Sequence, residues 1–255
     1  MKSLLKDMIL ACGSVVGLPH DRASILMYHS ISDRSEYFST VSPHQFASHM
    51  AYLVSLKRPV IALSELVRRI TTHEPLGGAI VLTFDDGYQD NYTIAFPILL
   101  KHGFPATIFV ATDCMGKNDD RHMRYLSETE LVSMQNSGLV EIEPHTKSHV
   151  KLTRSPLESA RMQIEESKHI LESIRKKPCI TFAPPWGMFD NAIIDLVRSA
   201  GFLASVGVHE GTVSAHADPF RLPRNSIDRS TTMMQFKGKV SRAIDGYVAL
   251  SGACQ

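Results

Sequence analysis

Short apolar runs alternate with amphipathic segments along most of this 255-residue chain. Seven of these runs are rich in β-branched and aromatic residues, which is typical of buried strands in a parallel sheet. They lie at residues 24–30, 60–63, 79–84, 106–112, 139–145, 179–185 and 202–208. Strands that alternate with helices predict parallel pairing with right-handed crossovers. In a chain of this length, the pattern favours a single-domain α/β barrel over an open sheet.

The segments between the strands carry start and stop signals for helices. Ser127 and Glu130 have the spacing of a capping box, and Gly138 is placed to end the helix that follows. Pro156 stands at the start of a longer periodic segment that reaches toward Arg175. Both segments therefore predict helices within the alternating pattern.

The two ends of the chain stand apart from this pattern. Residues 1–22 predict an N-terminal amphipathic helix or leader, residues 23–235 the folded domain, and residues 236–255 a C-terminal helix or tail. The apolar residues that fall on one face of the first segment at helical spacing are Leu4, Leu5, Met8, Ile9 and Cys12.

The N-terminal segment makes a poor signal peptide. Lys6 and Asp7 interrupt its apolar stretch, and no A-x-A cleavage pattern follows. No run approaches the ~20 apolar residues that cross a bilayer, so we expect no transmembrane span. These features favour a cytoplasmic or membrane-peripheral location over a periplasmic one, and they leave peripheral membrane association open.

Charge and cysteine content argue against several kinds of partner and site. The chain has 27 Lys and Arg residues against 26 Asp and Glu residues, so no strong field indicates nucleic acid as a partner. The four cysteines are far apart and form no C-x-x-C pair, which argues against a thiolate zinc site and a dense disulfide framework. Nothing in the composition indicates an oligomeric state.

The first chemical signal is a pair of neighbouring carboxylates. Asp85 and Asp86 follow the apolar run AIVLTF directly, and Gly87 allows the backbone to turn sharply after them. In a parallel α/β barrel the chemistry collects at the C-terminal ends of the strands, so both carboxylates are expected at the rim. An ordinary Asp-Asp-Gly turn is the alternative.

A second cluster, EPHTKSH, places two histidines at the end of another predicted strand. His145 and His149 are four residues apart, and a helical turn here would put both imidazoles on one face, about 5–6 Å apart at Cβ. With one carboxylate they supply three ligands for a divalent cation and leave positions open for water and substrate. We therefore expect Asp86 to bind a metal and Asp85 to accept a proton from the attacking water.

These residues give the chain a specific family resemblance. TFDDG at 83–87 is followed after about 60 residues by HTKSH at 145–149, and TFAPPWG comes next at 181–187. This pairing of motifs resembles the NodB-like polysaccharide deacetylases, which form carbohydrate esterase family 4. The resemblance extends from Ile25 to Ile227.

The resemblance implies a fold and a set of roles. The fold is a distorted (β/α)7 barrel, and the metal ligands are Asp86, His145 and His149. Asp85 is implied as the general base. The backbone N–H of Trp186 would help to hold the oxyanion, and Pro185 and Trp186 would wall the sugar site. A proline-stiffened turn with a packed tryptophan is the other interpretation of this motif, and the two are compatible.

Two family positions are not filled in the usual way. Ala183 stands where many members have an arginine that orients the base. Arg224, in RLPRNSI, is the candidate replacement from a neighbouring strand, with an ordinary surface arginine as the alternative. The C-terminal Leu-x-His that supplies the general acid is also missing, and the nearby His209 is expected in a solvated loop.

His29 is the candidate for the missing acid. ILMYHSI at 25–31 resembles the first strand of the exopolysaccharide deacetylase branch, which acts on poly-N-acetylglucosamine and in which the strand order is circularly permuted. In that branch the histidine of this strand takes the place of the acid. On this resemblance His29 protonates the leaving amine; a histidine that only caps the strand end is the alternative.

The resemblance implies a metal-dependent hydrolase that removes N-acetyl groups from an amino-sugar glycan, with an N-acetylated oligosaccharide as its substrate partner. Zinc is the expected ion for an Asp-His-His set, although nickel, cobalt, iron and manganese accept the same ligands. Two rivals stay open. One is a carbohydrate-binding member of the fold with weak or no catalysis, and the other is a deacetylase or amidase that acts on a lipid-linked or small substrate.

Overall fold

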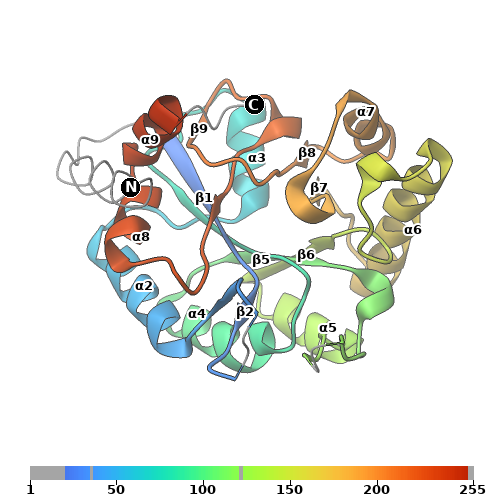
Figure 1. Ribbon diagram of the computed structural model, residues 1–255, viewed down its shortest axis with the longest axis horizontal. Helices are drawn as coiled ribbons and strands as arrows, with labels where there is room; N and C mark the ends of the chain where they lie inside the picture. The colour runs from blue at the N-terminus through green and yellow to red at the C-terminus, as the bar shows by residue number, and fades with distance from the viewer. Residues whose placement is uncertain (1–20, 35–36, 121–122, 252–255) are drawn as a thin grey trace.

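Seven strands surround the core in the part of the chain that the structure describes, and helices cover them from outside (Figure 1). The computed structural model describes residues 21–34, 37–120 and 123–251. The barrel strands are β1 (Arg22–Tyr28), β4 (Ile80–Phe84), β5 (Ala106–Val110), β6 (Val140–Pro144), β7 (Thr181–Phe182), β8 (Ala204–Ser205) and β10 (Asn225–Ser226). The first six coincide with predicted apolar runs, and β10 was not predicted. The α/β barrel itself is confirmed.

The barrel is distorted because its strands do not form one continuous ladder. Five strands pair in parallel in the order β10-β1-β4-β5-β6, whereas β7 and β8 form a separate two-stranded sheet. The register places Tyr28 beside Phe84 and Val110 beside Pro144, so the C-terminal ends of these strands meet at one rim. A single parallel bridge joins Val206, after β8, to Leu222, ahead of β10.

The helices of the described residues are α2 (Pro43–Ser55), α3 (Leu63–Thr71), α4 (Phe96–His102), α5 (Glu128–Asn136), α6 (Leu157–Arg175), α7 (Asn191–Ser199), α8 (Met233–Lys239) and α9 (Ala243–Ser251). The predicted capping box of α5 is confirmed, because the Glu130 N–H donates to the Ser127 hydroxyl and the Glu130 carboxylate accepts from the Ser127 N–H. Gly138 follows that helix with φ 75°, and Pro156 is the N-cap of α6.

The strand predicted at residues 60–63 is wrong. Val60 forms one isolated bridge with Ile80, and α3 begins at Leu63. Leu63, Leu66, Val67 and Ile70 of α3 are buried, which is the spacing of one helical face. The end of the apolar run therefore belongs to a helix, because the residues after it continue a period of 3.6 rather than 2.

Alternate side chains of the strands enter two apolar cores. One core includes Ile25, Val81 and Phe109 and lies inside the barrel, and the other packs between the strands and the helices. Because successive side chains of a strand point to opposite faces, Asp85 follows Val81 and Thr83 onto the inner face. The alternation of β4 therefore directs the carboxylate into the barrel.

The C-terminal segment forms two short helices, α8 and α9, whereas the sequence predicted one helix or a tail from residue 236. The Asp245 carboxylate of α9 accepts from the N–H and the hydroxyl of Thr212, which holds α9 against the barrel. The predicted N-terminal helix or leader lies outside the described residues, except that Arg22 already begins β1. Among the described helices, none has the length and apolar character to cross a bilayer.

A buried histidine joins α2 to α8. His49 is fully buried, its ring stacks on Phe236 at a centroid distance of 3.8 Å, and its Nδ1 lies 3.1 Å from the Tyr28 hydroxyl. Burial lowers the pKa of His49 to about 4 from 6.5. The neutral ring is therefore part of the folded core near neutral pH.

We expect His49 to make the fold sensitive to mild acid. Below pH 6.5 the unfolded chain protonates this histidine before the folded chain does, so the free energy of unfolding falls between pH 6.5 and about 4. The slope from this group is at most ~1.4 kcal/mol per pH unit. Urea unfolding of wild type and His49→Gln at several pH values measures it. His49→Gln should lose this slope, whereas His44→Gln, on the exposed face of α2, should keep it.

Candidate metal centre

Two neighbouring carboxylates diverge at the end of β4. Asp86 has φ 71° and Gly87 has φ 75°, so the backbone turns through two left-handed residues directly after Asp85. A side chain at Gly87 would meet Val110 at 3.2 Å, which explains why this turn needs glycine. Both carboxylates are buried, with exposed fractions of 3% for Asp85 and 6% for Asp86. Each must therefore find its own compensating partners.

Asp86 faces the two predicted histidines. Its Oδ1 atom lies 3.5 Å from Nε2 of His145 and 3.1 Å from Nε2 of His149. Donor atoms of the three side chains all lie within 4.8 Å of one another. The structure thus brings together three residues from two separate segments of the chain.

The histidines converge without a helical turn. His145 follows β6, and residues 145–149 form an irregular loop in which Thr146 has φ 66° and His149 has φ 54°. Left-handed residues reverse the chain locally, and this brings the two imidazole centroids to 5.1 Å. The helical turn considered for the H-x-x-x-H spacing is therefore not formed.

A backbone carbonyl fixes the tautomer of His145. The carbonyl of Ala183 can only accept, so Nδ1 of His145 carries a proton and donates to it over 2.6 Å. Nε2 then keeps its lone pair and points toward Asp86. Metal-binding histidines are commonly oriented by such a bond through their other nitrogen.

The donor set fits a divalent metal ion. Ligand atoms at ~2.0–2.1 Å from a tetrahedral zinc lie about 3.3 Å apart. The two separations from Asp86, 3.1 and 3.5 Å, bracket this value. Burial raises the pKa of Asp86, but the imidazoles of His145 and His149 that face it outweigh burial and hold the pKa well below its usual range. The carboxylate is therefore ionised, as a metal ligand must be.

Arg224 pairs with the other carboxylate, Asp85. Its two terminal nitrogens donate to the two oxygens of Asp85 over 2.6 and 2.7 Å, and its Nε donates to the carbonyl of Gly207 over 2.8 Å. The guanidinium is fully buried, so it is not an ordinary surface arginine. Burial raises the pKa of Asp85, but the charge of Arg224 and its hydrogen bonds lower the pKa by more than burial raises it. The result is a pKa below the usual value.

His29 stands beside both carboxylates. It follows β1 directly, and its positive charge, when present, contributes to lowering the pKa of Asp85 and of Asp86. Nδ1 of its ring is buried and has no hydrogen-bond partner among the described residues. The aromatic ring of Tyr37 contacts the imidazole edge-on at a centroid distance of 6.3 Å. The histidine therefore lies at the predicted rim position.

The motif TFAPPWG forms a turn next to the histidines. Pro185 is buried and Trp186 has φ 58°, a left-handed conformation that is uncommon for a bulky residue. The indole is 46% exposed, and its centroid lies 4.6 Å from the ring of His149. The Lys151 ammonium lies 4.9 Å from the same indole. Trp186 thus presents an aromatic surface beside the metal site.

Comparison with known proteins assigns the family. The sequence profile described as polysaccharide deacetylase matches residues 73–205, more than half of the chain. The chain belongs to the polysaccharide deacetylase family. It is therefore a hydrolase with the distorted barrel of that family.

Relatives and solved structures agree with this assignment. A poly-β-1,6-N-acetyl-D-glucosamine N-deacetylase of Staphylococcus epidermidis is 26% identical over 193 residues, which cover 72% of this chain and 67% of the relative. A polysaccharide deacetylase from Bacillus cereus matches with TM-score 0.73 and 25% identity over 86% of this chain and 69% of its own. A Streptococcus pyogenes deacetylase in complex with acetate shares the fold, with TM-score 0.76 and 23% identity over 84% of this chain and 96% of its own.

Sequence reasoning missed a row of tyrosines on the His29 side of this deacetylase site. Tyr37 contacts Tyr88 at 6.2 Å, and Tyr88 stacks on Tyr125 at 5.0 Å between ring centroids. An antiparallel bridge between Tyr88 and Tyr125 holds the segment before α5 against the Asp-Asp-Gly turn. Tyr88 follows that motif directly in sequence, whereas nothing local in the sequence indicates that Tyr37 and Tyr125 join it.

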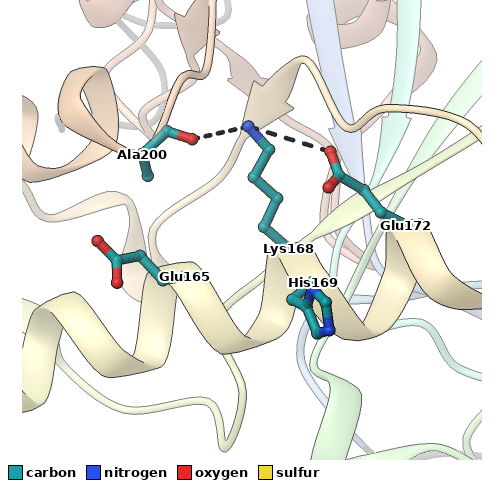
Figure 2. A pocket seen from close by; sticks show the side chains of 5 residues that line it. All are labelled: Glu165, Lys168, His169, Glu172 and Ala200. Carbon is teal, nitrogen blue, oxygen red and sulfur yellow. Dashed lines mark hydrogen bonds and ion pairs between the residues drawn. The ribbon is translucent and has the colours of Figure 1, made fainter.

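A shallow hollow on the outer side of the barrel takes no part in the deacetylase site. Figure 2 shows its lining side chains, which come from α6 and the end of α7: Glu165, Lys168, His169, Glu172 and Ala200. Lys168 occupies its centre, donating to the carbonyl of Ala200 over 2.7 Å and lying 4.0 Å from the Glu172 carboxylate. The hollow contains none of the residues that the sequence singled out.

We expect removal of the Asp86 carboxylate to abolish metal binding. Asp86→Ala takes away the one anionic ligand and leaves two neutral imidazoles, so the purified variant should contain almost no divalent metal. Elemental analysis after equilibration with zinc measures this content. Asp113→Ala removes an exposed carboxylate after β5 and should leave the metal content of the deacetylase unchanged. Equal metal content in Asp86→Ala and wild type would contradict the assigned ligand set.

Proposed function

We propose that this deacetylase removes N-acetyl groups from an amino-sugar glycan through a divalent metal held by Asp86, His145 and His149. The observation that carries the proposal is the division between the two carboxylates. Asp86 faces the imidazoles, whereas Asp85 is held by Arg224. One carboxylate is thus available as a ligand and the other as a base.

The bound metal would polarise the acetyl carbonyl and lower the pKa of its water toward ~7. Asp85 accepts the proton of the attacking water, since its carboxylate is ionised at neutral pH. Arg224 holds this carboxylate in one orientation by two hydrogen bonds. The backbone N–H of Trp186 donates to the oxyanion that forms on the acetyl group.

His29 is proposed as the general acid. An amide nitrogen leaves poorly unless it is protonated, so the reaction needs a donor on the far side of the scissile bond from Asp85. His29 lies close enough to both carboxylates to influence their pKa values. As an imidazolium it donates this proton to the nitrogen and becomes neutral. After the products leave, Asp85 releases the proton that it took up to solvent and His29 regains one from solvent, so both groups return to their starting states.

The proposed substrate is a polymer or oligomer of N-acetylglucosamine. The exposed indole of Trp186 suits the apolar face of a pyranose ring, and Pro185 stiffens the turn that carries it. The Staphylococcus epidermidis relative is named for poly-β-1,6-N-acetyl-D-glucosamine, which favours this polymer over other N-acetylated glycans. Zinc is the proposed ion, because it prefers nitrogen and oxygen ligands in a tetrahedral set with one open position.

An acetate-release assay with the zinc-loaded protein tests the proposed function. We expect acetate and free amines to appear in equal amounts from β-1,6-linked N-acetylglucosamine oligomers. Retention of the oligomers without acetate would identify a carbohydrate-binding protein instead. Acetate from small amides or lipid-linked sugars, with none from the oligomers, would favour the second rival.

Replacing Asp85 should separate catalysis from metal binding. Asp85→Asn keeps the shape of the side chain but removes the proton acceptor, so turnover should fall by about 10²–10⁴-fold. Zinc content should stay at one ion per chain, because Asp86 and the histidines are untouched. Initial rates of acetate release and elemental analysis of the same sample provide the two readouts. A variant as active as wild type would show that another group is the base.

Arg224 should set the acid side of the pH–rate profile. Its charge is the largest influence that lowers the pKa of Asp85, so Arg224→Met should raise that pKa and move the acid limb of kcat/KM to higher pH. The variant also leaves a buried carboxylate unpaired, which costs about 3–5 kcal/mol of stability. Arg221→Met removes a surface arginine of the same segment and should change neither property. An unshifted acid limb in a folded Arg224→Met sample would contradict the pairing.

A further inference from the structure

The seam between β6 and β7 adjoins the metal site, because His145 follows β6 directly and is bonded to the carbonyl of Ala183, which follows β7. The described backbone has no paired ladder between these strands, and the Ala183 N–H reaches the carbonyl of Pro144 at 3.4 Å. Pro144 has no N–H to offer to a neighbouring strand. Two side chains span this seam instead. They belong to Glu143, in β6, and to His145, the first residue after β6.

Glu143 forms hydrogen bonds with the backbone at the start of β7. One carboxylate oxygen accepts from the N–H groups of both Ile180 and Thr181 over 2.9 Å each. Its other oxygen accepts from Arg175, the last residue of α6, over 3.1 Å. Glu143 is only 2% exposed, so these bonds are made away from water. The carboxylate thereby supplies the acceptors that a continuous ladder would have supplied.

Arg175 is itself held in place. Its Nε donates to the Gln135 side chain over 2.8 Å, and the Gln135 amide donates back to the Arg175 carbonyl over 3.1 Å. The Cys179 thiol accepts from the same guanidinium over 3.0 Å. The anchor of Glu143 is therefore a buried network that joins α5, α6 and β7, and not a single mobile side chain.

The hydrogen bonds of Glu143 at the start of β7 affect the position of the metal ligand His145 through this strand. Ala183 follows Thr181 by two residues, and its carbonyl accepts the Nδ1 proton of His145. If β7 shifted along the seam, this carbonyl would leave the imidazole, and His145 would lose the bond that fixes its tautomer. Glu143 and His145, two residues apart, thus bind the backbone on either side of Phe182: Glu143 at residues 180–181 and His145 at Ala183.

We propose that Glu143 is a positioning residue for the metal ligand His145. It holds β7 in the position in which the Ala183 carbonyl orients the His145 imidazole. In that orientation Nε2 of His145 faces the ion. The inference rests on the proposed metal site but not on the identity of the substrate. Glu143 touches neither metal nor substrate; it acts through β7.

Glu141 provides a matched control on the same strand. It also projects to the inner face of the barrel, two residues before Glu143, but its carboxylate accepts from Ser64 and from Thr107, which lies on β5. None of these contacts involves β7. Replacing Glu141 therefore changes a nearby, partly buried carboxylate of the same strand without loosening the seam.

The experiment compares Glu143→Gln with Glu141→Gln in the full chain. Glutamine keeps the size of the side chain, but its amide must face either Arg175 or the backbone N–H groups, where only an acceptor fits. We expect zinc affinity, measured by chelator competition, to weaken by about 10–100-fold in Glu143→Gln. Affinity in Glu141→Gln should equal that of wild type. The assays are run at pH 8, because burial raises the pKa of Glu143 to about 7.

A second readout uses the metal-free protein. In wild type, the Nδ1 proton of His145 should give a protected imidazole N–H signal in histidine-selective NMR, and Glu143→Gln should lose or broaden it. If glutamine prevents folding, Glu143→Asp keeps the charge but is too short to reach both Arg175 and β7, and the same losses are expected. Wild-type affinity and an unchanged NMR signal in a folded Glu143 variant would overturn the inference. Equal weakening in Glu141→Gln would do so as well.

These outcomes are distinguishable from failure of the proposed function. The NMR signal is measured without metal or substrate, and zinc affinity does not depend on acetate release. A protein that binds zinc but deacetylates no glycan would overturn the proposed activity and leave the role of Glu143 intact.

Discussion

The structure depends on how two adjacent carboxylates are accommodated at the end of one buried strand. Removing each charge from water costs several kcal/mol, and two like charges side by side add repulsion. The left-handed turn at Asp86 sends the two side chains in different directions. Asp85 receives a buried guanidinium, whereas Asp86 receives two imidazoles. Separate compensation gives the two acids separate chemistry, and the pattern of a base beside a metal ligand follows from it.

The barrel brings those compensating groups together from distant parts of the chain. Arg224 approaches from the segment leading into β10, and the histidines follow β6. The histidines arrive because the C-terminal strand ends share one rim, whereas Arg224 lies before its strand and its guanidinium reaches Asp85 beside Thr83 and Phe109. The distortion of the barrel also matters, because the open seam beside β6 leaves the Ala183 carbonyl free to orient His145. The irregular part of the fold and the ligand geometry are thus linked.

Much of this arrangement was predictable from the sequence, since the motifs are local. Asp85, Asp86 and the two histidines follow apolar runs, so their position at strand ends could be predicted from periodicity alone, and their pairing matched a known family. The helix limits at Ser127 and Gly138 were predictable because capping depends on neighbouring residues. The strand predicted at residues 60–63 is not formed, since a short apolar segment fits a strand and a helix equally well.

Other features could not be predicted because they depend on contacts between distant segments. The pairing of the Arg224 guanidinium with Asp85 is one of them, since an arginine in a loop has no sequence signal for burial. The roles of Glu143 and Tyr125 also depend on which strands adjoin. The loop at residues 145–149 reaches the right ligand spacing through positive φ angles instead of the helical turn that its spacing suggested. Anomalous diffraction from zinc-loaded crystals tests the central claim most directly. The account predicts one ion bonded to Asp86, His145 and His149, with Asp85 outside its coordination shell and still paired with Arg224. An ion bonded to Asp85, or one bound elsewhere while these three side chains stay unliganded, would contradict it.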